Sequence, residues 1–474
     1  MEDRTPKKFS AAGIVPAAAT MVGVISLLYL WLGADAAVNV VERVPIPENT
    51  PQLTSGLAPT SEAGAVKGEL LKFDGVPADL PGVWPRFRGA NFDAISNEKA
   101  AIARRWPVGG PHVIWSVELG EGYAGAAVLN GRVYVVDYDQ QKKGDAIRCL
   151  SLADGKEIWR YFYPVKIKRY HGMSRTVPAV TDKYLVAMGP KCHVTCLNST
   201  TGELRWMLDL VKDFGAKVPQ WYAGQCPLIE EDKAIIGVGG ESLVMAVDCE
   251  SGQIVWKTPN PNEWTMTHSS IMPADFAGAR MYIYCAGGGV VGISAQDGNL
   301  LWQYTDWKIN IANVPAPVAV GDGLIFLSGG YNAGSMMLKL TQADGGIKAE
   351  PVFKLSPEVF GAPQHTPIFF QEHIYGVRPD GELVCLDLSG KVMWTSTSAH
   401  KFGLGPYTIV NGLLYVMNDS GVLTLVEASP VGYSQLAEAK VLEGPDSWGP
   451  MAAVGGRLIV RDLTRMVCLD IAEQ

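Results

Sequence analysis

The amino-acid sequence predicts an all-β fold, an eight-bladed β-propeller of four-stranded antiparallel blades, preceded by one transmembrane helix and a linker. Three observations predict this fold. A sequence unit recurs eight times after residue 110, with a mean spacing of about 46 residues. Each unit contains short runs of β-branched and aromatic residues between turn dipeptides. The last unit ends before its final strand, and a strand of the missing kind precedes the first unit.

Length and composition narrow the class of protein. The chain has 474 residues, of which 47% are hydrophobic and 19% are charged. These values are close to those of ordinary globular proteins. A net charge of −8 argues against a nucleic-acid-binding surface. Because only the first segment is apolar enough to meet lipid, a protein with several membrane spans is excluded.

The N-terminal segment is predicted to anchor the chain in a membrane. Basic residues precede a long run without any charge, and about 20 apolar residues suffice to cross a bilayer. Residues 1–10 are therefore predicted to stay cytoplasmic, residues 11–34 to form a transmembrane signal-anchor helix, and the rest to be exported. Cleavage as a signal peptide near Ala36 is the alternative. Residues 35–83 are proline-rich and are predicted to be an extended linker.

The repeated unit predicts four strands. The same spacing from a cysteine through a glycine to a tryptophan occurs at Cys149–Trp159 and at Cys196–Trp206. The glycine supplies the positive φ of a tight hairpin, so the tryptophan falls on the last strand of the unit. A proline about 18–21 residues before most copies fits the start of a first strand, where no ladder donor is lost. The tryptophans are predicted to be structural packing residues: Trp115, Trp159, Trp206, Trp256, Trp302 and Trp394.

The two ends of the repeat array predict how the ring closes. The chain stops six residues after Cys468, too early for the fourth strand of the eighth unit. A strand with its tryptophan, Trp115, stands before the first complete unit. If this strand completes the eighth blade, no sheet edge is left open between the chain ends. The propeller is therefore predicted to cover residues 113–474, with residues 84–112 as a lead-in segment packed on it.

The repeat resembles the pyrroloquinoline-quinone-like (PQQ-like) β-propeller repeat. The resemblance rests on the unit with Cys-Leu-Asp, Gly and Trp at fixed spacing, and on the lead-in Trp84-Pro85-Arg86-Phe87-Arg88-Gly89. Similar repeats occur in quinoprotein alcohol dehydrogenases and in the propeller lipoprotein of the bacterial outer-membrane barrel-assembly machine. The resemblance covers about residues 84–474 and is specific for the fold, whereas one propeller serves many chemistries. With the predicted anchor, it implies a single-pass inner-membrane protein of the bacterial cell envelope, with the propeller in the periplasm.

The quinoprotein resemblance would imply a PQQ cofactor with Ca²⁺, a catalytic aspartate and a pair of adjacent cysteines. The sequence contains no Cys-Cys dipeptide and no run with the spacing of a calcium-binding loop. It also lacks paired cysteines and histidines with zinc spacing. We therefore predict no catalytic residue, no metal site and no cofactor, and expect PQQ with Ca²⁺ only if the enzyme alternative holds.

Eight cysteines in an exported chain raise the question of disulfides. Cys149, Cys196, Cys385 and Cys468 take the same place in different units, so packed blades hold them about 10 Å apart, too far for a bridge. Cys192 lies four residues from Cys196 on one strand, about 13 Å away, and cannot pair with it. The pairing of three others stays open at this stage: Cys226, Cys249 and Cys285.

Polar and aromatic side chains are predicted to gather at the mouth of the central funnel, where the loops before the first strands converge. Such a mouth suits an extended peptide or a small planar ligand. The alternative is that these groups bond neighbouring blades and water in the channel. The candidates are Arg175, Gln225, His268, Asn313, Gln364, His365, Trp221, Trp264, Trp307 and Trp448.

Two functions remain at this stage. The anchor, the spacer and the compact repeats predict a membrane-tethered, non-enzymatic scaffold outside the cytoplasm that binds an unknown protein partner. Envelope assembly is one role that the family resemblance implies for it. The alternative is a quinoprotein dehydrogenase, or another small-ligand enzyme that uses the central funnel. Nucleic acid is expected to be a partner in neither case.

Overall fold

A computed structural model describes residues 67–343 and 345–473. The predicted anchor at residues 11–34 and most of the predicted linker lie outside the described residues. Within the described part of the chain, no helix has the length and apolar character that crossing a membrane requires.

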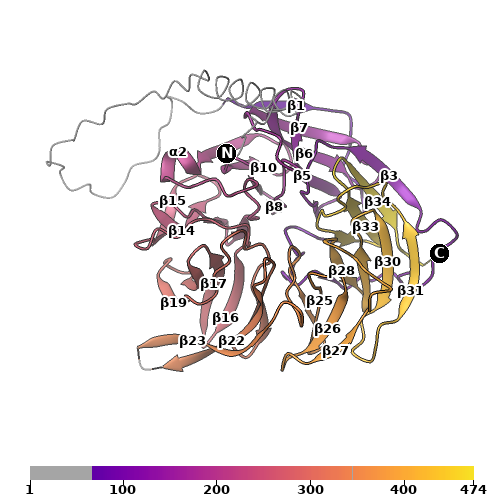
Figure 1. Ribbon diagram of the computed structural model, residues 1–474. Helices are drawn as coiled ribbons and strands as arrows, with labels where there is room; N and C mark the ends of the chain where they lie inside the picture. The colour runs from indigo at the N-terminus through magenta and orange to yellow at the C-terminus, as the bar shows by residue number, and fades with distance from the viewer. Residues whose placement is uncertain (1–66, 344, 474) are drawn as a thin grey trace, which may run out of the picture. The chain divides into compact units, whose positions relative to one another are not determined.

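Eight sheets, each with a four-stranded meander, surround a central axis (Figure 1). Blade 1 contains β4 (Ala127–Leu129), β5 (Arg132–Asp139), β6 (Gly144–Ser151) and β7 (Glu157–Pro164). Blade 2 contains β8 (Ala179–Val180), β9 (Tyr184–Met188), β10 (His193–Asn198) and β11 (Leu204–Asp209). Blade 3 contains β12 (Leu228–Glu230), β13 (Lys233–Gly237), β14 (Ser242–Asp248) and β15 (Ile254–Pro259). Blade 4 contains β16 (Met272–Phe276), β17 (Ala279–Ala286), β18 (Gly289–Ser294) and β19 (Leu300–Tyr304).

The second half of the ring repeats this order. Blade 5 contains β20 (Val318–Gly321), β21 (Leu324–Gly329), β22 (Gly334–Ala343) and β23 (Gly346–Leu355). Blade 6 contains β24 (Ile368–Phe370), β25 (His373–Val377), β26 (Leu383–Asp387) and β27 (Val392–Thr395). Blade 7 contains β28 (Tyr407–Val410), β29 (Leu413–Met417), β30 (Val422–Glu427) and β31 (Gln435–Lys440). Blade 8 contains β32 (Ala452–Val454), β33 (Arg457–Arg461), β34 (Arg465–Asp470) and β3 (Val113–Glu118).

The eighth sheet joins strands from both ends of the propeller. β3 runs antiparallel to β34, and Trp115 lies opposite Cys468 in the register. Figure 1 shows the indigo β3 beside the yellow β34. The pairing of these two strands is the one that the unfinished last repeat predicts.

Tryptophan and glycine connect successive blades. Trp115 of blade 8 donates its indole N–H to the carbonyl of Leu152 in blade 1, at 3.0 Å. Trp159 of blade 1 packs against Gly202 of blade 2, where an added Cβ would lie 2.6 Å from the indole ring. The six structural tryptophans that the sequence predicts are all buried, and each lies opposite the repeat position on the neighbouring strand. In blade 5, Phe353 takes the equivalent position.

The interior of the blades holds all eight cysteines as buried free thiols. The four that the sequence places in equivalent strands are among them, as predicted. Cys226, Cys249 and Cys285, whose pairing the sequence leaves open, are also unpaired in the described part of the chain. Burial raises the pKa of the Cys226 thiol to about 11, so it stays protonated at neutral pH.

Segments before the propeller add two strands to its sheets, and one short helix follows blade 2. β1 (Glu69–Lys72) pairs antiparallel with β7 at the outer edge of blade 1, although it falls within the predicted linker. β2 (Ile95–Ser96) pairs parallel with β28, the innermost strand of blade 7. A short helix, α2 (Leu210–Phe214), follows β11 and is capped by the Asp209 carboxylate.

The lead-in segment crosses beneath the centre of the ring. Trp84 exchanges backbone hydrogen bonds with Val128 of blade 1. Four residues later, the buried Arg88 guanidinium donates to the carbonyls of Thr366 and Pro367 in blade 6, at 2.9 and 3.0 Å. Because a buried guanidinium needs acceptors for its donors, these carbonyls fix the path of the segment. Phe87, between these two contacts, is thereby held at the ring's centre.

Candidate functional site

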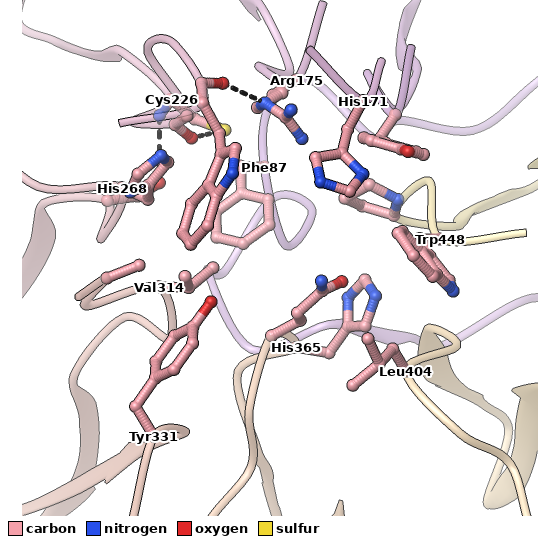
Figure 2. A pocket seen from close by; sticks show the side chains of 17 residues that line it. Phe87, His171, Arg175, Cys226, His268, Val314, Tyr331, His365, Leu404 and Trp448 are labelled. Atoms are coloured by element: carbon pink, nitrogen blue, oxygen red, sulfur yellow. Dashed lines mark hydrogen bonds between the residues drawn. The ribbon is translucent and has the colours of Figure 1, made fainter. Parts of the chain in front are cut away.

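A cavity of about 300 Å³ lies where the loops before the first strands converge, and all eight blades contribute to its wall (Figure 2). Phe87 of the lead-in segment forms part of the floor, and Figure 2 shows it behind the other side chains. The cavity volume is at the lower end of that of small-molecule sites. The lining residues are Phe87, Tyr123, His171, Arg175, Trp221, Gly224, Cys226, His268, Ser270, Ala312, Val314, Tyr331, Gln364, His365, Leu404, Trp448 and Pro450.

Three stacked aromatic rings form one side of the mouth. Trp221 lies between Tyr170 and Tyr331, at centroid distances of 6.4 and 6.3 Å and interplanar angles of 19° and 13°. Trp221 and Tyr331 adopt left-handed backbone conformations, with φ of 65° and 54°. Such a conformation costs a bulky residue about 1–2 kcal/mol and is frequent where a side chain must be presented to a ligand. The loops therefore present these rings at an energetic cost.

Arg175 supplies the positive charge of the cavity. Its Nε donates to the carbonyl of Trp221, and its Nη2 donates to the carbonyl of Gly172 at 3.0 Å. The guanidinium also lies over the ring of Tyr123, 5.1 Å from the centroid. Burial lowers the pKa of Arg175 to about 10, so it remains charged at neutral pH. Among the described lining residues, it is the only arginine, and lysine, aspartate and glutamate are not represented.

Two histidines of the wall are neutral at neutral pH. Burial lowers the pKa of His268 to about 4, and the charge of Arg175 adds to this effect. Burial alone lowers the pKa of His365 to about 4. The Nε2 atoms of both rings are buried and have no hydrogen-bond partner within the described part of the chain. The cavity therefore offers uncharged imidazole nitrogens beside one fixed cation.

Comparison with known proteins identifies the family. The family described as outer membrane protein assembly factor BamB matches residues 142–389, more than half of the chain. The chain belongs to this family. BamB from Moraxella catarrhalis has a similar structure, with 15% identity over 76% of this chain and 99% of that chain, at a TM-score of 0.53. At this identity the similarity shows the fold alone.

Two further solved structures are similar to this BamB-family chain to different degrees. The computationally designed Ika8 protein is 10% identical over 76% of this chain and all of that chain, with a TM-score of 0.53. A europium-containing methanol dehydrogenase is 12% identical over 82% of this chain and 91% of that chain, with a TM-score of 0.48. A search of the curated proteins finds no match.

Six of the ten funnel candidates predicted from the sequence line the cavity. Figure 2 shows Arg175, His365 and Trp448 around the cavity, and the other three also belong to its lining. These six side chains therefore belong to the cavity wall, and their role in binding a ligand stays a prediction. The six are Arg175, Trp221, His268, Gln364, His365 and Trp448.

The other four candidates are not among the residues that line this cavity, and their role stays a prediction. Gln225 accepts a hydrogen bond from Gly237 N at 2.8 Å, inside blade 3. Asn313 is buried, with 2% of its surface exposed. Trp264 lines a smaller groove between blades 3 and 4, where Asn260 holds its backbone N–H. Trp307 is 2% exposed and packs in the apolar core of blades 4 and 5.

Hydrogen bonds between neighbouring blades, the alternative role predicted for these polar groups, are also present beside the cavity. Cys226 N donates to Ser270 Oγ at 3.0 Å, joining blades 3 and 4. Ser269 Oγ donates to the carbonyl of Pro315 at 3.0 Å, joining blades 4 and 5. These side chains therefore support the ring, whereas the ring nitrogens of His268 and His365 have no such partner in the described residues.

Sequence reasoning missed several lining residues. Tyr331 comes from the loop between β21 and β22, which does not precede a first strand. Phe87 comes from the lead-in segment, outside the repeats. The adjacent glycines before Tyr331 mark a tight turn in the sequence, and they are the only signal for this ring. Tyr123 and His171 lie in loops before first strands and could have been found from the repeat register.

The lining does not fit PQQ held with Ca²⁺. A protein calcium site needs six to eight oxygen ligands, usually including carboxylates. The described wall supplies no carboxylate, and the hydroxyl of Ser270 already accepts the backbone N–H of Cys226. No group of three or more histidine, cysteine, aspartate or glutamate residues suitable for a metal ion occurs among residues 67–343 and 345–473.

Proposed function

We propose that this chain is a non-enzymatic scaffold of the bacterial cell envelope, which presents its propeller to another protein outside the cytoplasm. The observation that carries the proposal is the wall of the funnel, which combines aromatic rings, neutral imidazoles and one cation. Such a wall can bind and orient a ligand, and its described residues include no carboxylate. The family's description as an outer membrane assembly factor supports a role in envelope assembly.

The alternative, a quinoprotein dehydrogenase, receives no support from this wall. Oxidation of an alcohol requires a group that takes the hydroxyl proton, and efficient bases have pKa values near the working pH. His268 and His365, with pKa values of about 4, are weak bases. The described wall offers no aspartate or glutamate in their place.

We further propose that the propeller is tethered to the inner membrane and faces the periplasm. The charge pattern around residues 11–34 supports this orientation. The pairing of β1 with β7 fixes residues 69–72 to blade 1, so the tether would end there. The remaining proline-rich stretch would hold the propeller away from the bilayer as a semi-rigid spacer.

Crosslinking in intact cells tests the scaffold proposal. The full chain is purified after treatment with a short amine-reactive crosslinker, and the attached proteins are identified by mass spectrometry. We expect the same envelope protein in every repeat, recovered in an amount comparable to that of the chain itself. A chain that is always recovered alone would overturn the scaffold proposal.

A further inference from the structure

The charge of Arg175 is uncompensated in the described structure. Its hydrogen bonds go to backbone carbonyls, and Nη1 makes none to the described residues. Arg175 makes no ion pair within the described residues, and the two carboxylates at the opposite rim bond to neutral donors, Asp446 to the Tyr123 hydroxyl at 3.2 Å and Asp419 to the Trp448 indole at 2.7 Å. A half-buried cation without an anion is unfavourable, and an anionic ligand beside it gains a charge-assisted hydrogen bond.

A flat apolar surface lies next to this cation. The carbonyl of Trp221 itself holds Arg175 Nε, so the indole and the guanidinium are fixed relative to one another. The ring of Tyr331 is nearly parallel to that of Trp221, and Phe87 also lines the cavity (Figure 2). Aromatic rings bind other aromatic rings by offset stacking, which adds to the gain from apolar burial.

One loop at the approach to the cavity carries the same sign of charge as Arg175. Lys166 and Lys168 are exposed in the loop that leads to Tyr170, and neither makes an ion pair within the described residues. The carbonyl of Lys168 accepts the Tyr222 hydroxyl, which places this loop beside Trp221. Basic side chains at the rim of a pocket raise the association rate of an anion, and salt weakens this effect.

We propose that the central funnel binds a small aromatic carboxylate with one or two rings and a single negative charge, through the Arg175 guanidinium and the rings of Trp221 and Tyr331. One uncompensated cation selects a single charge, because each further carboxylate would meet neutral imidazoles and aromatic rings. A cavity of about 300 Å³ limits the ligand to a few rings at most. This binding site goes beyond the scaffold role, although both proposals start from the same funnel wall.

Calorimetric titration of the full chain in lipid nanodiscs tests this proposal. The probes are indole-3-carboxylate, the neutral isostere indole, and PQQ as a tricarboxylate of larger size. Empty nanodiscs measure partitioning of the probes into lipid. We expect saturable binding of indole-3-carboxylate with an affinity at least about tenfold above that of indole, falling as salt is added.

Three variants assign the binding to the funnel. Arg175→Gln should weaken indole-3-carboxylate about tenfold or more, and Tyr331→Leu should weaken it several-fold through loss of stacking. Tyr331 is 48% exposed, and its hydroxyl makes no hydrogen bond to the described residues, so this variant should fold even if Arg175→Gln does not. Arg104→Gln, at an exposed ion pair with Glu427, is the control and should bind like the natural chain.

Several results would overturn the proposal. They are the absence of saturable binding, equal affinity for indole and indole-3-carboxylate, or unchanged affinity in a folded Arg175→Gln or Tyr331→Leu variant. Tighter binding of PQQ than of indole-3-carboxylate would overturn the proposal that the ligand carries a single negative charge. None of these results bears on whether the chain binds a protein partner, which the crosslinking experiment tests separately.

Discussion

Asp145 makes the stability of this propeller sensitive to pH. It lies on β6, between Tyr138 of β5 and Tyr163 of β7 in the register, and has no exposed surface. Neither carboxyl oxygen has a hydrogen-bond partner in the described residues. The carboxyl group reaches the backbone of Gly189 in blade 2, where an added Cβ would lie 2.3 Å from Asp145 Oδ2. Burial raises the pKa of Asp145 to about 7.

The sign and size of the effect follow from this pKa. An aspartate has a pKa of 3.8 when it is not perturbed, so the folded chain binds its proton more tightly than the unfolded chain does. The stability that protonated Asp145 contributes is fully present below pH 3.8 and is lost as the pH rises towards 7. At about 1.36 kcal/mol per pKa unit, about three units correspond to roughly 4 kcal/mol. In the Asp145→Asn variant the side chain at this position cannot ionise, so this loss of stability does not occur.

Urea unfolding of the natural chain and of Asp145→Asn at pH 5 and pH 8 checks this prediction. The difference in free energy of unfolding should shift in favour of the variant by a few kcal/mol between the two pH values. Asp306→Asn, at an exposed position, is the matched control and should track the natural chain. A difference between Asp145→Asn and the natural chain that is the same at both pH values would refute the reasoning.

Two further substitutions test how the blades are joined. Trp115→Ala removes a 6% exposed indole and its bond to Leu152, and should cost about 3–5 kcal/mol in urea unfolding. A loss below about 0.5 kcal/mol, typical of surface changes, would contradict this role. Gly202→Ala places a side chain at φ of 77° and against Trp159, and should lower stability by about 2 kcal/mol. An unchanged thermal midpoint for Gly202→Ala would show that the close contact between Gly202 and Trp159 does not stabilise the ring.

Much of the ring could be predicted from the sequence because each blade repeats the same local contacts. The hairpin glycine and the tryptophan recur at fixed spacing, since each tryptophan must meet the turn of the next blade, as Trp159 meets Gly202. The pairing of Trp115 with Cys468 follows from counting strands at the two ends of the array. In blade 5, Phe353 takes the place of the tryptophan, and its partly buried ring packs against the neighbouring core while the strand order stays the same.

Elements that are not part of the repeated unit could not be predicted from the sequence. β1 and Phe87 pair or pack with residues distant in sequence, and nothing in a repeat pattern reports such contacts. The loops before the first strands share a place in the repeat but differ in conformation. Trp221 turns into the cavity through a left-handed backbone, whereas Asn260 holds Trp264 at another groove. Loop conformation, which the repeat register does not determine, therefore decides which candidates form the site.

A reconstitution assay tests most directly whether this funnel is the site of a quinoprotein dehydrogenase. The purified full chain is incubated with PQQ and Ca²⁺, and dye reduction is followed with a series of primary alcohols and sugars. We expect no absorbance of bound quinone after gel filtration and no dye reduction above that of a sample without protein. Stoichiometric retention of the quinone together with alcohol-dependent dye reduction would show that the funnel is an enzyme site.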